Sequence, residues 1–349
     1  MTEPVLSVRD LCVEFVTRRG VLRALDRVSF DIHKGEVLGV VGESGAGKSV
    51  TGSAVIGLIE PPGRIASGEV RLQGERIDTL SPEAMRHVRG KRIGMVFQDP
   101  LTSLNPLYRV GDQLTETIRT HLPLNAAQAR RRAIELLAEV GIPAPERRID
   151  GYPHEFSGGM RQRVVLALAL CAEPELVIAD EPTTALDVSV QAQIITLLKR
   201  ICAERGTAVM LITHDMGVIA ETADRVAVMY AGRVAEIGPV REVVSRPFHP
   251  YAAGLMGSIP TLESSADRLV QIPGSMPRLT RIPAGCAFNP RCPHVHDRCR
   301  VERPELLSRG DHLVACHLYD EPGVDAEALV QRDRVAAAVR PSAVAGGVA

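Results

Sequence analysis

A glycine-rich stretch near the start of the sequence has the residue types and the spacing of a phosphate-binding loop. It fits the pattern G-x-x-x-x-G-K-[ST] at every fixed position, with the residues Gly42, Glu43, Ser44, Gly45, Ala46, Gly47, Lys48 and Ser49. The glycines allow successive backbone N–H groups to turn toward phosphate oxygens, at the positive end of a helix dipole. Lys48 would reach the β- and γ-phosphates of a nucleotide, and the Ser49 hydroxyl would hold Mg²⁺. The loop therefore predicts a nucleotide-binding site.

Two adjacent carboxylates, Asp180 and Glu181, follow the apolar run at residues 176–179. A carboxylate at the end of a buried strand beside a phosphate loop can hold Mg²⁺ directly or through water, so we expect Asp180 to be that ligand. Glu181 would polarise an attacking water as a general base, which typically contributes about 10²–10⁴ in rate. The pair therefore predicts that the bound nucleotide is hydrolysed.

A second phosphate-binding helix start lies between the loop and the acidic pair. Ser157 precedes Gly158 and Gly159 at the beginning of a predicted helix, which presents a hydroxyl and backbone N–H groups together. One γ-phosphate does not need two such sites in one chain. We therefore expect the second site to serve a nucleotide that another chain holds.

These motifs, with Gln98, Asp187 and His214, resemble those of the ATPase subunits of ATP-binding cassette (ABC) transporters, in the same order and spacing over residues 5–245. The resemblance implies that the bound nucleotide is ATP. Gln98 would then sense Mg²⁺ and the attacking water and touch the transmembrane partner, and His214 would be the switch histidine near the γ-phosphate. Asp187 would be the aspartate of the D-loop, and Phe15 would stack on adenine.

The signature segment of that family usually reads Leu-Ser-Gly-Gly-Gln, whereas this chain has Phe156 and Met160 at the two ends. The serine and the two glycines, which supply the hydroxyl and N–H donors, are intact. The resemblance implies that Ser157, Gly158, Gly159 and Met160 contact the ATP bound by a second ATPase subunit.

Three segments, at residues 97–106, 156–163 and 246–251, resemble the oligopeptide and dipeptide importer branch of this family. The resemblance implies that the chain powers peptide import from the cytoplasmic face of the membrane, as a peripheral subunit. Its partners would be two transmembrane permease subunits, a second ATPase subunit that is often not identical, and a substrate-binding protein outside the membrane. Relatives in this branch also move nickel chelates, glutathione and glycosides, so the solute stays open.

A soluble ABC ATPase that acts on DNA or the ribosome is the main alternative. Such proteins usually carry two cassettes or a long coiled-coil insertion, whereas this chain has one phosphate loop and no sustained heptads. The formal net charge of −1 gives no electrostatic reason to expect nucleic acid as a partner. A P-loop kinase would leave the segment from Ser157 to Gly159 unexplained. Permease and binding-protein genes beside this one would decide between these functions.

The elements that must position these residues predict an α/β fold of the ABC type. Strands alternating with helices indicate a mostly parallel sheet covered on both faces, joined to an antiparallel β region near the N-terminus. Apolar residues at helical spacing indicate a helical insertion over about residues 107–172. The strands are expected at residues 5–8, 13–16, 24–32, 37–41, 92–97, 176–179, 208–213, 226–230 and 233–237.

Three parts are expected along the chain: an ATPase domain over residues 1–258, a small module rich in cysteine and proline over 259–322, and a disordered tail over 323–349. The 349 residues allow one large domain and an appendage. No apolar run is long enough to cross a bilayer, and no N-terminal stretch suggests export.

The seven cysteines divide into two groups. Cys12, Cys171 and Cys202 sit among apolar residues and are expected to be inert core thiols. The other four fall in a proline-rich segment with few large apolar side chains, and a module that small usually needs a staple. In a reducing cytosol the staple is expected to be a metal site rather than disulfides. These four are Cys286, Cys292, Cys299 and Cys316.

Spacing alone does not assign the metal at these four cysteines. The gaps of five, six and sixteen residues fit neither the close pairs of a zinc knuckle nor the ferredoxin patterns. Zinc is the alternative because histidines lie nearby as further ligands. The segment 285–293 resembles the C-terminal module of peptide-importer ATPases, some of which bind a four-iron cluster, and this resemblance implies a 4Fe–4S cluster.

Overall fold

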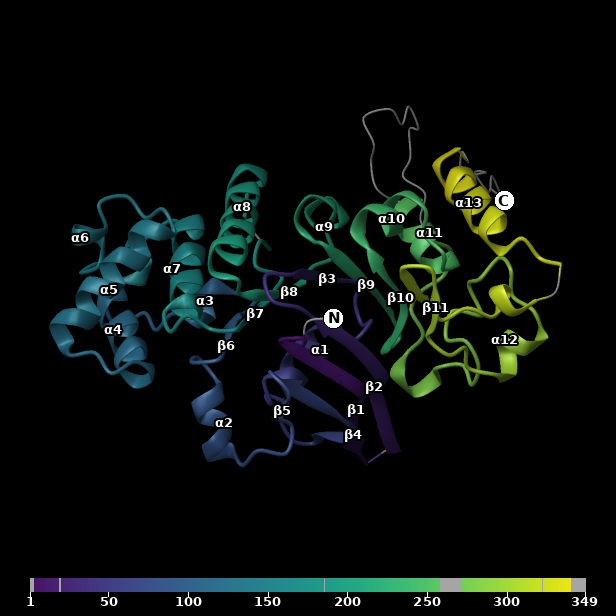
Figure 1. Ribbon diagram of the computed structural model, residues 1–349, viewed down its shortest axis with the longest axis horizontal. Helices are drawn as coiled ribbons and strands as arrows, with labels where there is room; N and C mark the ends of the chain where they lie inside the picture. Colours follow the sequence, from purple (N-terminus) through teal and green to yellow (C-terminus); the bar gives the residue numbers. More distant parts are fainter. Residues whose placement is uncertain (1–2, 19, 185, 258–271, 322, 340–349) are drawn as a thin grey trace, which may run out of the picture.

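The computed structural model describes residues 3–18, 20–184, 186–257, 272–321 and 323–339. Two β-sheets and the helices around them form this part of the chain (Figure 1). The strands are β1 (Leu6–Thr17), β2 (Gly20–Ile32), β3 (Val37–Val41), β4 (Gly63–Leu72), β5 (Glu75–Arg76), β6 (Ile93–Val96), β7 (Leu176–Asp180), β8 (Ala208–Ile212), β9 (Arg225–Tyr230), β10 (Arg233–Pro239), β11 (Leu307–Arg309) and β12 (His312–Val314). The α-helices are α1 (Lys48–Val55), α2 (Pro82–Val88), α3 (Pro100–Ser103), α4 (Val110–His121), α5 (Ala126–Glu139), α6 (Pro145–Arg148), α7 (Gly158–Leu170), α8 (Val188–Arg205), α9 (Met216–Thr222), α10 (Val240–Ser245), α11 (Pro250–Gly257), α12 (Asp297–Val301) and α13 (Ala326–Val339).

The larger sheet carries the functional residues. It has eight strands in the order β11-β12-β10-β9-β3-β8-β7-β6, and its strands run parallel from β9 to β6. In Figure 1, α8, α9 and α10 lie above this sheet and α1 lies below it. Because both faces are covered, β3, β7 and β8 are buried along their whole length, which explains their unbroken apolar sequences. The predicted parallel sheet is confirmed.

The smaller sheet is antiparallel, with the order β2-β1-β4-β5. The two short strands expected at residues 5–8 and 13–16 are one strand, β1. Its pairing shifts register between Val8 and Leu11, where Asp10 has a left-handed φ of 45°. Such an irregularity resets the alternation of buried and exposed side chains, which made the sequence read as two strands.

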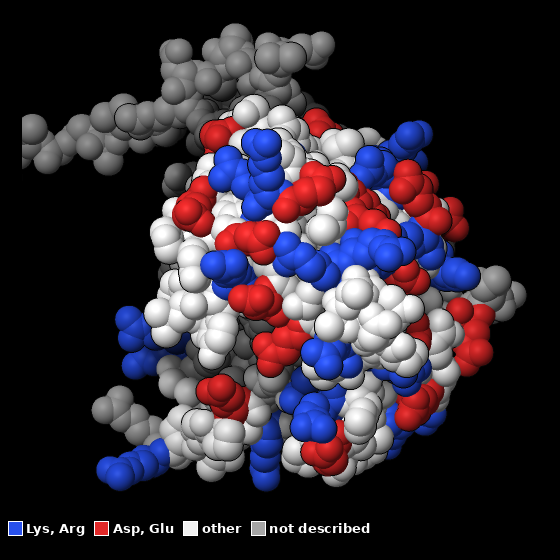
Figure 2. Space-filling view, turned by 90° about the vertical axis from the view of Figure 1, so that its left-hand side faces the viewer, with Lys and Arg blue, Asp and Glu red and all other residues white. Residues whose placement is uncertain are grey.

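The predicted helical insertion is present as helices α4 to α7, at the left of Figure 1. Figure 2 views the molecule from this side and shows basic and acidic side chains interspersed. Arg130 and Arg132 of α5 lie 2.8 Å from Asp150 and 2.7 Å from Glu173, respectively. The arginine-rich stretch of α5 is thus a solvated face with acidic partners.

The C-terminal segment, defined here as residues 272–321, is joined to the larger sheet. Strand β12 pairs with β10, at Glu236 with Val314 and at Ile237 with Leu313, and β11 then pairs with β12. The predicted domain boundary near residue 258 lies outside the described residues. The sheet continues across that boundary, because strands from both sides of it are hydrogen-bonded neighbours.

A helix lies within residues 323–349, the stretch that was expected to be a disordered tail. Helix α13 occupies residues 326–339 and packs against α11. Ala326 and Val330 are buried there, in a small cluster with Ala253 and Leu318. The sequence of α13 is rich in alanine, which favours a helix, and the contact with α11 supplies the burial that such a helix needs. Residues 340–349 lie outside the described residues.

Crossing a bilayer requires a helix that is both long and apolar, and none of the helices in the described part of the chain meets that requirement.

Candidate functional site

The phosphate loop runs from the carboxyl end of β3 to α1, so a buried strand and a helix both fix it. Gly47, directly before α1, has a left-handed φ of 103°. A Cβ atom at Gly47 would lie 2.8 Å from Cδ2 of Leu25, and one at Gly42 would lie 2.3 Å from the carbonyl oxygen of Met229. A larger residue at either position would push the loop away from its neighbours, which explains why glycine is needed there.

Lys48 is held inside the loop. Its Nζ donates hydrogen bonds to the carbonyl oxygens of Gly42, at 2.8 Å, and of Glu43, at 3.2 Å. Burial lowers the pKa of Lys48, and the carboxylates of Glu181 and Asp180 partly oppose that shift. The ammonium group of Lys48 therefore lies at the loop, bound to two carbonyl oxygens that the oxygens of a phosphate group could replace.

Ser49 and Asp180 bring two oxygen ligands together. The Ser49 hydroxyl, on α1, donates a hydrogen bond at 3.1 Å to Oδ1 of Asp180, the last residue of β7. Burial raises the pKa of Asp180, and the hydrogen bond from Ser49 opposes the shift. Hydroxyl and carboxylate oxygens are ligands that Mg²⁺ accepts, so this pair fits the predicted magnesium site.

Glu181 lies at the centre of the expected catalytic group. Its Oε1 is 3.1 Å from Nδ1 of His214, and its Oε2 accepts hydrogen bonds from Nε2 of Gln98 and from the Thr184 hydroxyl, both at 2.9 Å. Burial alone would raise the pKa of Glu181, but the hydrogen bonds from His214 and Thr184 outweigh it and hold that pKa below its usual value. The structure thus brings together the three predicted catalytic residues and adds Thr184, which sequence reasoning missed.

The backbone of Glu181 is itself unusual, with a left-handed φ of 47°. Non-glycine residues in this region of φ typically cost about 1–3 kcal/mol and cluster at functional sites. The conformation turns the chain directly after β7, so that the carboxylate faces Gln98 and His214.

These residues surround an open pocket with a volume of about 310 Å³. Its lining comes from the loop, the start of α1 and the catalytic group: Ser44, Gly45, Ala46, Gly47, Lys48, Ser49, Val50, Gln98, Glu181 and His214.

Four residues predicted to bind ATP are not among those that line this pocket: Phe15, Gly42, Glu43 and Asp180. Phe15 is half-buried on β1, opposite Gly63 of β4, so its role as the adenine platform stays a prediction. The carboxylate of Glu43 is instead bound by Arg291, and its backbone N–H donates a hydrogen bond to the Tyr251 hydroxyl at 2.9 Å. Tyr251 and Arg291 both belong to segments that the sequence singled out, 246–251 and 285–293, but neither residue was given a role at the phosphate loop.

The signature segment lies away from the pocket. Ser157 caps α7, where its side chain accepts a hydrogen bond from the Met160 N–H at 3.3 Å. Ser157 and Gly158 are exposed, and a Cβ at Gly159 would lie 2.6 Å from Val190 of α8. None of these residues is among those that line the pocket. The Ser157 hydroxyl and the backbone of Gly158 therefore lie at the molecular surface, outside the pocket.

Asp187 caps the N-terminus of α8, accepting hydrogen bonds from the Val190 N–H at 3.0 Å and from the Ser189 hydroxyl at 2.7 Å. Ala185, two residues before it in the expected D-loop, lies outside the described residues.

The three cysteines that the sequence assigned to the core, Cys12, Cys171 and Cys202, are buried. The other four come together in the C-terminal segment. Burial raises the pKa of the Cys316 thiol, and the neighbouring thiols of Cys292, Cys286 and Cys299 raise it further. The Cys286 N–H also donates a hydrogen bond to the Cys299 carbonyl at 2.9 Å.

The side-chain geometry at these four cysteines does not by itself support a metal site. No group of three or more cysteine, histidine or carboxylate side chains in the described ranges is close enough to hold a metal ion. Neither zinc nor a 4Fe–4S cluster gains support from that geometry, and both stay predictions.

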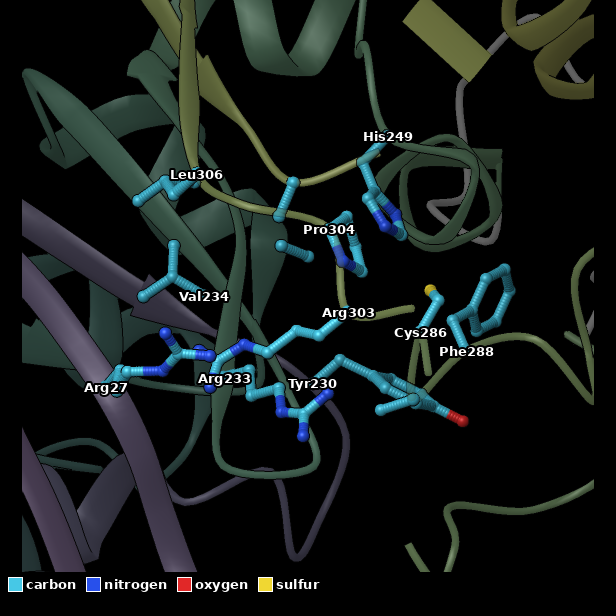
Figure 3. A pocket seen from close by; sticks show the side chains of 13 residues that line it. Arg27, Tyr230, Arg233, Val234, His249, Cys286, Phe288, Arg303, Pro304 and Leu306 are labelled. Carbon is cyan, nitrogen blue, oxygen red and sulfur yellow. The ribbon is translucent and has the colours of Figure 1, made fainter. Parts of the chain in front are cut away.

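The C-terminal segment meets the ATPase part of the chain around a small cavity of about 40 Å³ (Figure 3). Cys286 and Phe288 enter it from one side, and Tyr230 and Arg233 from the other. An ion pair crosses this interface: Arg303 lies 2.8 Å from the Asp26 carboxylate of β2, which Arg233 of β10 also contacts at 2.8 Å. The segment is thus fixed to β2 and β10 by charge as well as by strand pairing.

Comparison with protein families matches two parts of the chain. Residues 25–184 match the family described as ABC transporter, and residues 235–299 match the family described as oligopeptide/dipeptide transporter, C-terminal region. The second match begins within β10 and so spans both sides of the boundary near residue 258.

Individual relatives match most of the chain. The oligopeptide transport ATP-binding protein OppD of Bacillus subtilis (strain 168) is 50% identical over 326 residues, covering 92% of this chain and 91% of the relative. The dipeptide transport ATP-binding protein DppD of Escherichia coli (strain K12) is 46% identical, covering 90% and 96%. A dimeric structure of an ATP-binding cassette in a post-hydrolysis state, bound to ADP and Pi, has a TM-score of 0.61 at 28% identity, covering 68% of this chain and 99% of that one. The chain therefore belongs to the ABC transporter family, among its oligopeptide and dipeptide transport ATP-binding proteins.

Proposed function

We propose that this chain is the ATP-hydrolysing subunit of a transporter that imports peptides. The observation that carries the proposal is the separation of its two phosphate-binding motifs, of which only one lines the pocket. A site that is incomplete in one chain needs a second ATPase subunit to supply the signature. The names of the relatives add the substrate class, since the OppD and DppD relatives are described as oligopeptide and dipeptide transport proteins.

In the proposed mechanism, Lys48 binds the β- and γ-phosphates, and Ser49 and Asp180 would hold Mg²⁺, which would neutralise phosphate charge. Glu181 accepts a proton from the attacking water, since its lowered pKa keeps it ionised near neutral pH. Gln98 and His214 orient Glu181 through their hydrogen bonds. The exposed Ser157 and the glycines after it then bind the γ-phosphate of ATP that the opposing subunit holds.

The proposed assembly contains two ATPase subunits, two permease subunits and a substrate-binding protein outside the membrane. The ATPase subunits would lie on the cytoplasmic face, peripheral to the membrane. The name of the OppD relative of Bacillus subtilis, an oligopeptide transport ATP-binding protein, supports a role within a transport assembly. Closing of two ATPase subunits around ATP would drive the permeases.

Uptake by the reconstituted transporter tests the proposal. The complex that co-purifies with the full-length chain is placed in proteoliposomes, with its binding protein outside and ATP inside. We expect ATP-dependent uptake of labelled dipeptides or oligopeptides, and the Glu181→Gln variant as control should abolish it. Uptake of a nickel chelate, glutathione or a glycoside instead would change the solute but keep the transporter. A chain that hydrolyses ATP without co-purifying permeases would refute the transport function.

A second proposal concerns Cys286, Cys292, Cys299 and Cys316, which we infer hold a 4Fe–4S cluster. Thiols are the ligands that such clusters use, and the four interact electrostatically around Cys316. The preference for the cluster over zinc rests on the segment 285–293, which resembles the C-terminal module of peptide-importer ATPases, some of which bind a four-iron cluster. The cluster would order the C-terminal segment and take no part in hydrolysis.

The metal content of anaerobically purified protein tests this second proposal. We expect brown protein with iron and acid-labile sulfide in equal amounts, and a colour that bleaches on reduction. The Cys299→Ser variant should lose the colour, whereas Cys171→Ser, which changes a buried core thiol, should keep it. Stoichiometric zinc without iron would show that the four cysteines hold zinc and not a cluster.

A further inference from the structure

Arg291, between two of the four cysteines in the sequence, reaches the phosphate loop. Its guanidinium contacts the Glu43 carboxylate twice, at 2.6 Å and 2.9 Å, so the pair is bidentate. The side chain of Arg291 is only 5% exposed and that of Glu43 is 29% exposed. A planar, bidentate contact fixes orientation as well as distance, which a single contact does not.

The guanidinium of Arg291 is also fixed from the side of the C-terminal segment. It donates hydrogen bonds to the carbonyl oxygens of Pro273, at 2.8 Å, and of Ile272, at 3.1 Å. It lies over the rings of Tyr230 and Phe288, at 5.8 Å and 5.9 Å from their centroids. Figure 3 shows these two rings beside each other at the interface. Arg291 therefore has little freedom to move unless the C-terminal segment moves with it.

Glu43 transmits this constraint to the part of the loop that binds phosphate. Its N–H is held by the buried Tyr251 hydroxyl, as described above. Its carbonyl oxygen accepts hydrogen bonds from Nζ of Lys48, at 3.2 Å, and from the Ala46 N–H, at 3.1 Å. Only one residue, Glu43, thus lies between Arg291 and the lysine that binds the β- and γ-phosphates.

We propose that Arg291 is a positioning residue for ATP binding, which it controls by holding Glu43 and, through it, the phosphate loop. The affinity for nucleotide then depends on the C-terminal segment being docked. Because such coupling is reciprocal, bound nucleotide stabilises the docked segment to the same extent. The inference rests on ATP binding by the loop, and it is independent of the imported solute and of what the four thiols hold.

Nucleotide affinity of the full-length protein tests the inference directly. The variants Arg291→Gln, Glu43→Gln and the double variant are compared with wild type, using a fluorescent ATP analogue and the ATPase activity of the complete complex. We expect each single variant to weaken binding and raise KM about tenfold, with kcat within about twofold, since couplings of this kind span about 5–150-fold. The double variant should lose no more than either single one, because both remove the same contact.

Arg298→Gln is the matched control, since Arg298 lies in the same segment but pairs with Glu302 and Asp320, away from the loop. It should leave nucleotide affinity unchanged. Hydrogen exchange gives an independent readout: ATP should slow exchange at residues 272–300 in wild type and in Arg298→Gln, but much less in Arg291→Gln.

Unchanged affinity in folded Arg291→Gln, or losses that add in the double variant, would overturn the inference. If Arg291→Gln does not fold, Glu43→Gln still tests the inference, because it leaves the C-terminal segment intact. Glu43→Gln with wild-type affinity would then overturn the inference by itself. A wild-type chain that fails to bind ATP would refute the proposed function instead.

Discussion

Replacing the buried Glu236 with glutamine should loosen the joint between the ATPase part of the chain and the C-terminal segment. Glu236 is fully buried on β10, and its two oxygens accept hydrogen bonds from the N–H groups of Phe248, at 3.0 Å and 3.1 Å, and of His249, at 2.8 Å. Oε1 also lies 2.9 Å from Nδ1 of His312 on β12. A glutamine has only one accepting oxygen, so its NH₂ group must face at least one of these donors.

The cost follows from that mismatch. Losing one charge-assisted hydrogen bond costs about 1.5–3 kcal/mol, and leaving a buried donor without an acceptor costs about 1–3 kcal/mol. Together they agree with about 3–5 kcal/mol for breaking a buried charged pair. For 349 residues, at about 2.1 cal/mol/K per residue, each kcal/mol lowers the melting temperature by about 1.4 °C, so it should fall by at least about 4 °C. Hydrogen exchange should localise the loss to β10, β12 and the segment 247–249.

Glu242→Gln is the control, because Glu242 contacts the other nitrogen of the same histidine, at 3.0 Å, from a side chain that is 53% exposed. An exposed partner of this kind typically contributes at most about 1 kcal/mol. Equal melting temperatures for Glu236→Gln and Glu242→Gln would refute the reasoning, since burial of Glu236 would then make no difference.

Three further outcomes are expected. Glu181→Gln should retain ATP binding while hydrolysis falls by about 10²-fold or more. The variant should also accumulate as an ATP-bound dimer on gel filtration. Near-normal turnover of the variant in the complete complex would show that Glu181 is not the general base. Ser157→Arg should leave ATP binding to the isolated chain intact but impair hydrolysis at the phosphate loop of the opposing subunit. The assay pairs the variant with a partner subunit whose phosphate loop is the only functional one in the dimer. An unimpaired partner site would contradict the two-chain arrangement. Burial would lower the pKa of His312, but its contacts with Glu236 and Glu242 raise it, so the folded state binds more protons than the unfolded state above about pH 6.5. Stability should therefore be highest below about pH 6.5 and fall as the pH rises through the raised pKa, and His312→Gln should remove this slope in urea titrations.

Much of the site could be predicted because its information is local in the sequence. The phosphate loop, the acidic pair after β7 and the serine at the start of α7 each combine residue types with a strand end or a helix start. The parallel sheet makes such local signals converge, since the carboxyl ends of its strands meet at one edge. Gln98 and Glu181, which follow the carboxyl ends of β6 and β7, are hydrogen-bonded for this reason.

The contacts of the C-terminal segment could not be predicted, because they join residues far apart in the chain. Arg291 and Glu43 are 248 positions apart, and Arg303 and Asp26 are 277 apart. An ion pair has no periodicity, so only the folded structure shows which charges meet. Strand β4 was missed for a different reason: its glycines and polar residues hide the strand pattern, and its partner β1 lies much earlier in the sequence.

The addition of β12 to the sheet has a consequence for how the protein can be handled. Strand β10 would be the outermost strand of a chain that stopped near residue 258, with a row of backbone N–H and C=O groups open to other molecules. Exposed strand edges are templates for pairing between chains and so promote aggregation. In the structure described here β11 and β12 cover that edge, and the outermost strand, β11, spans only three residues. Short edge strands resist such pairing, so we expect a chain without the C-terminal segment to aggregate more readily, independently of what the four thiols bind.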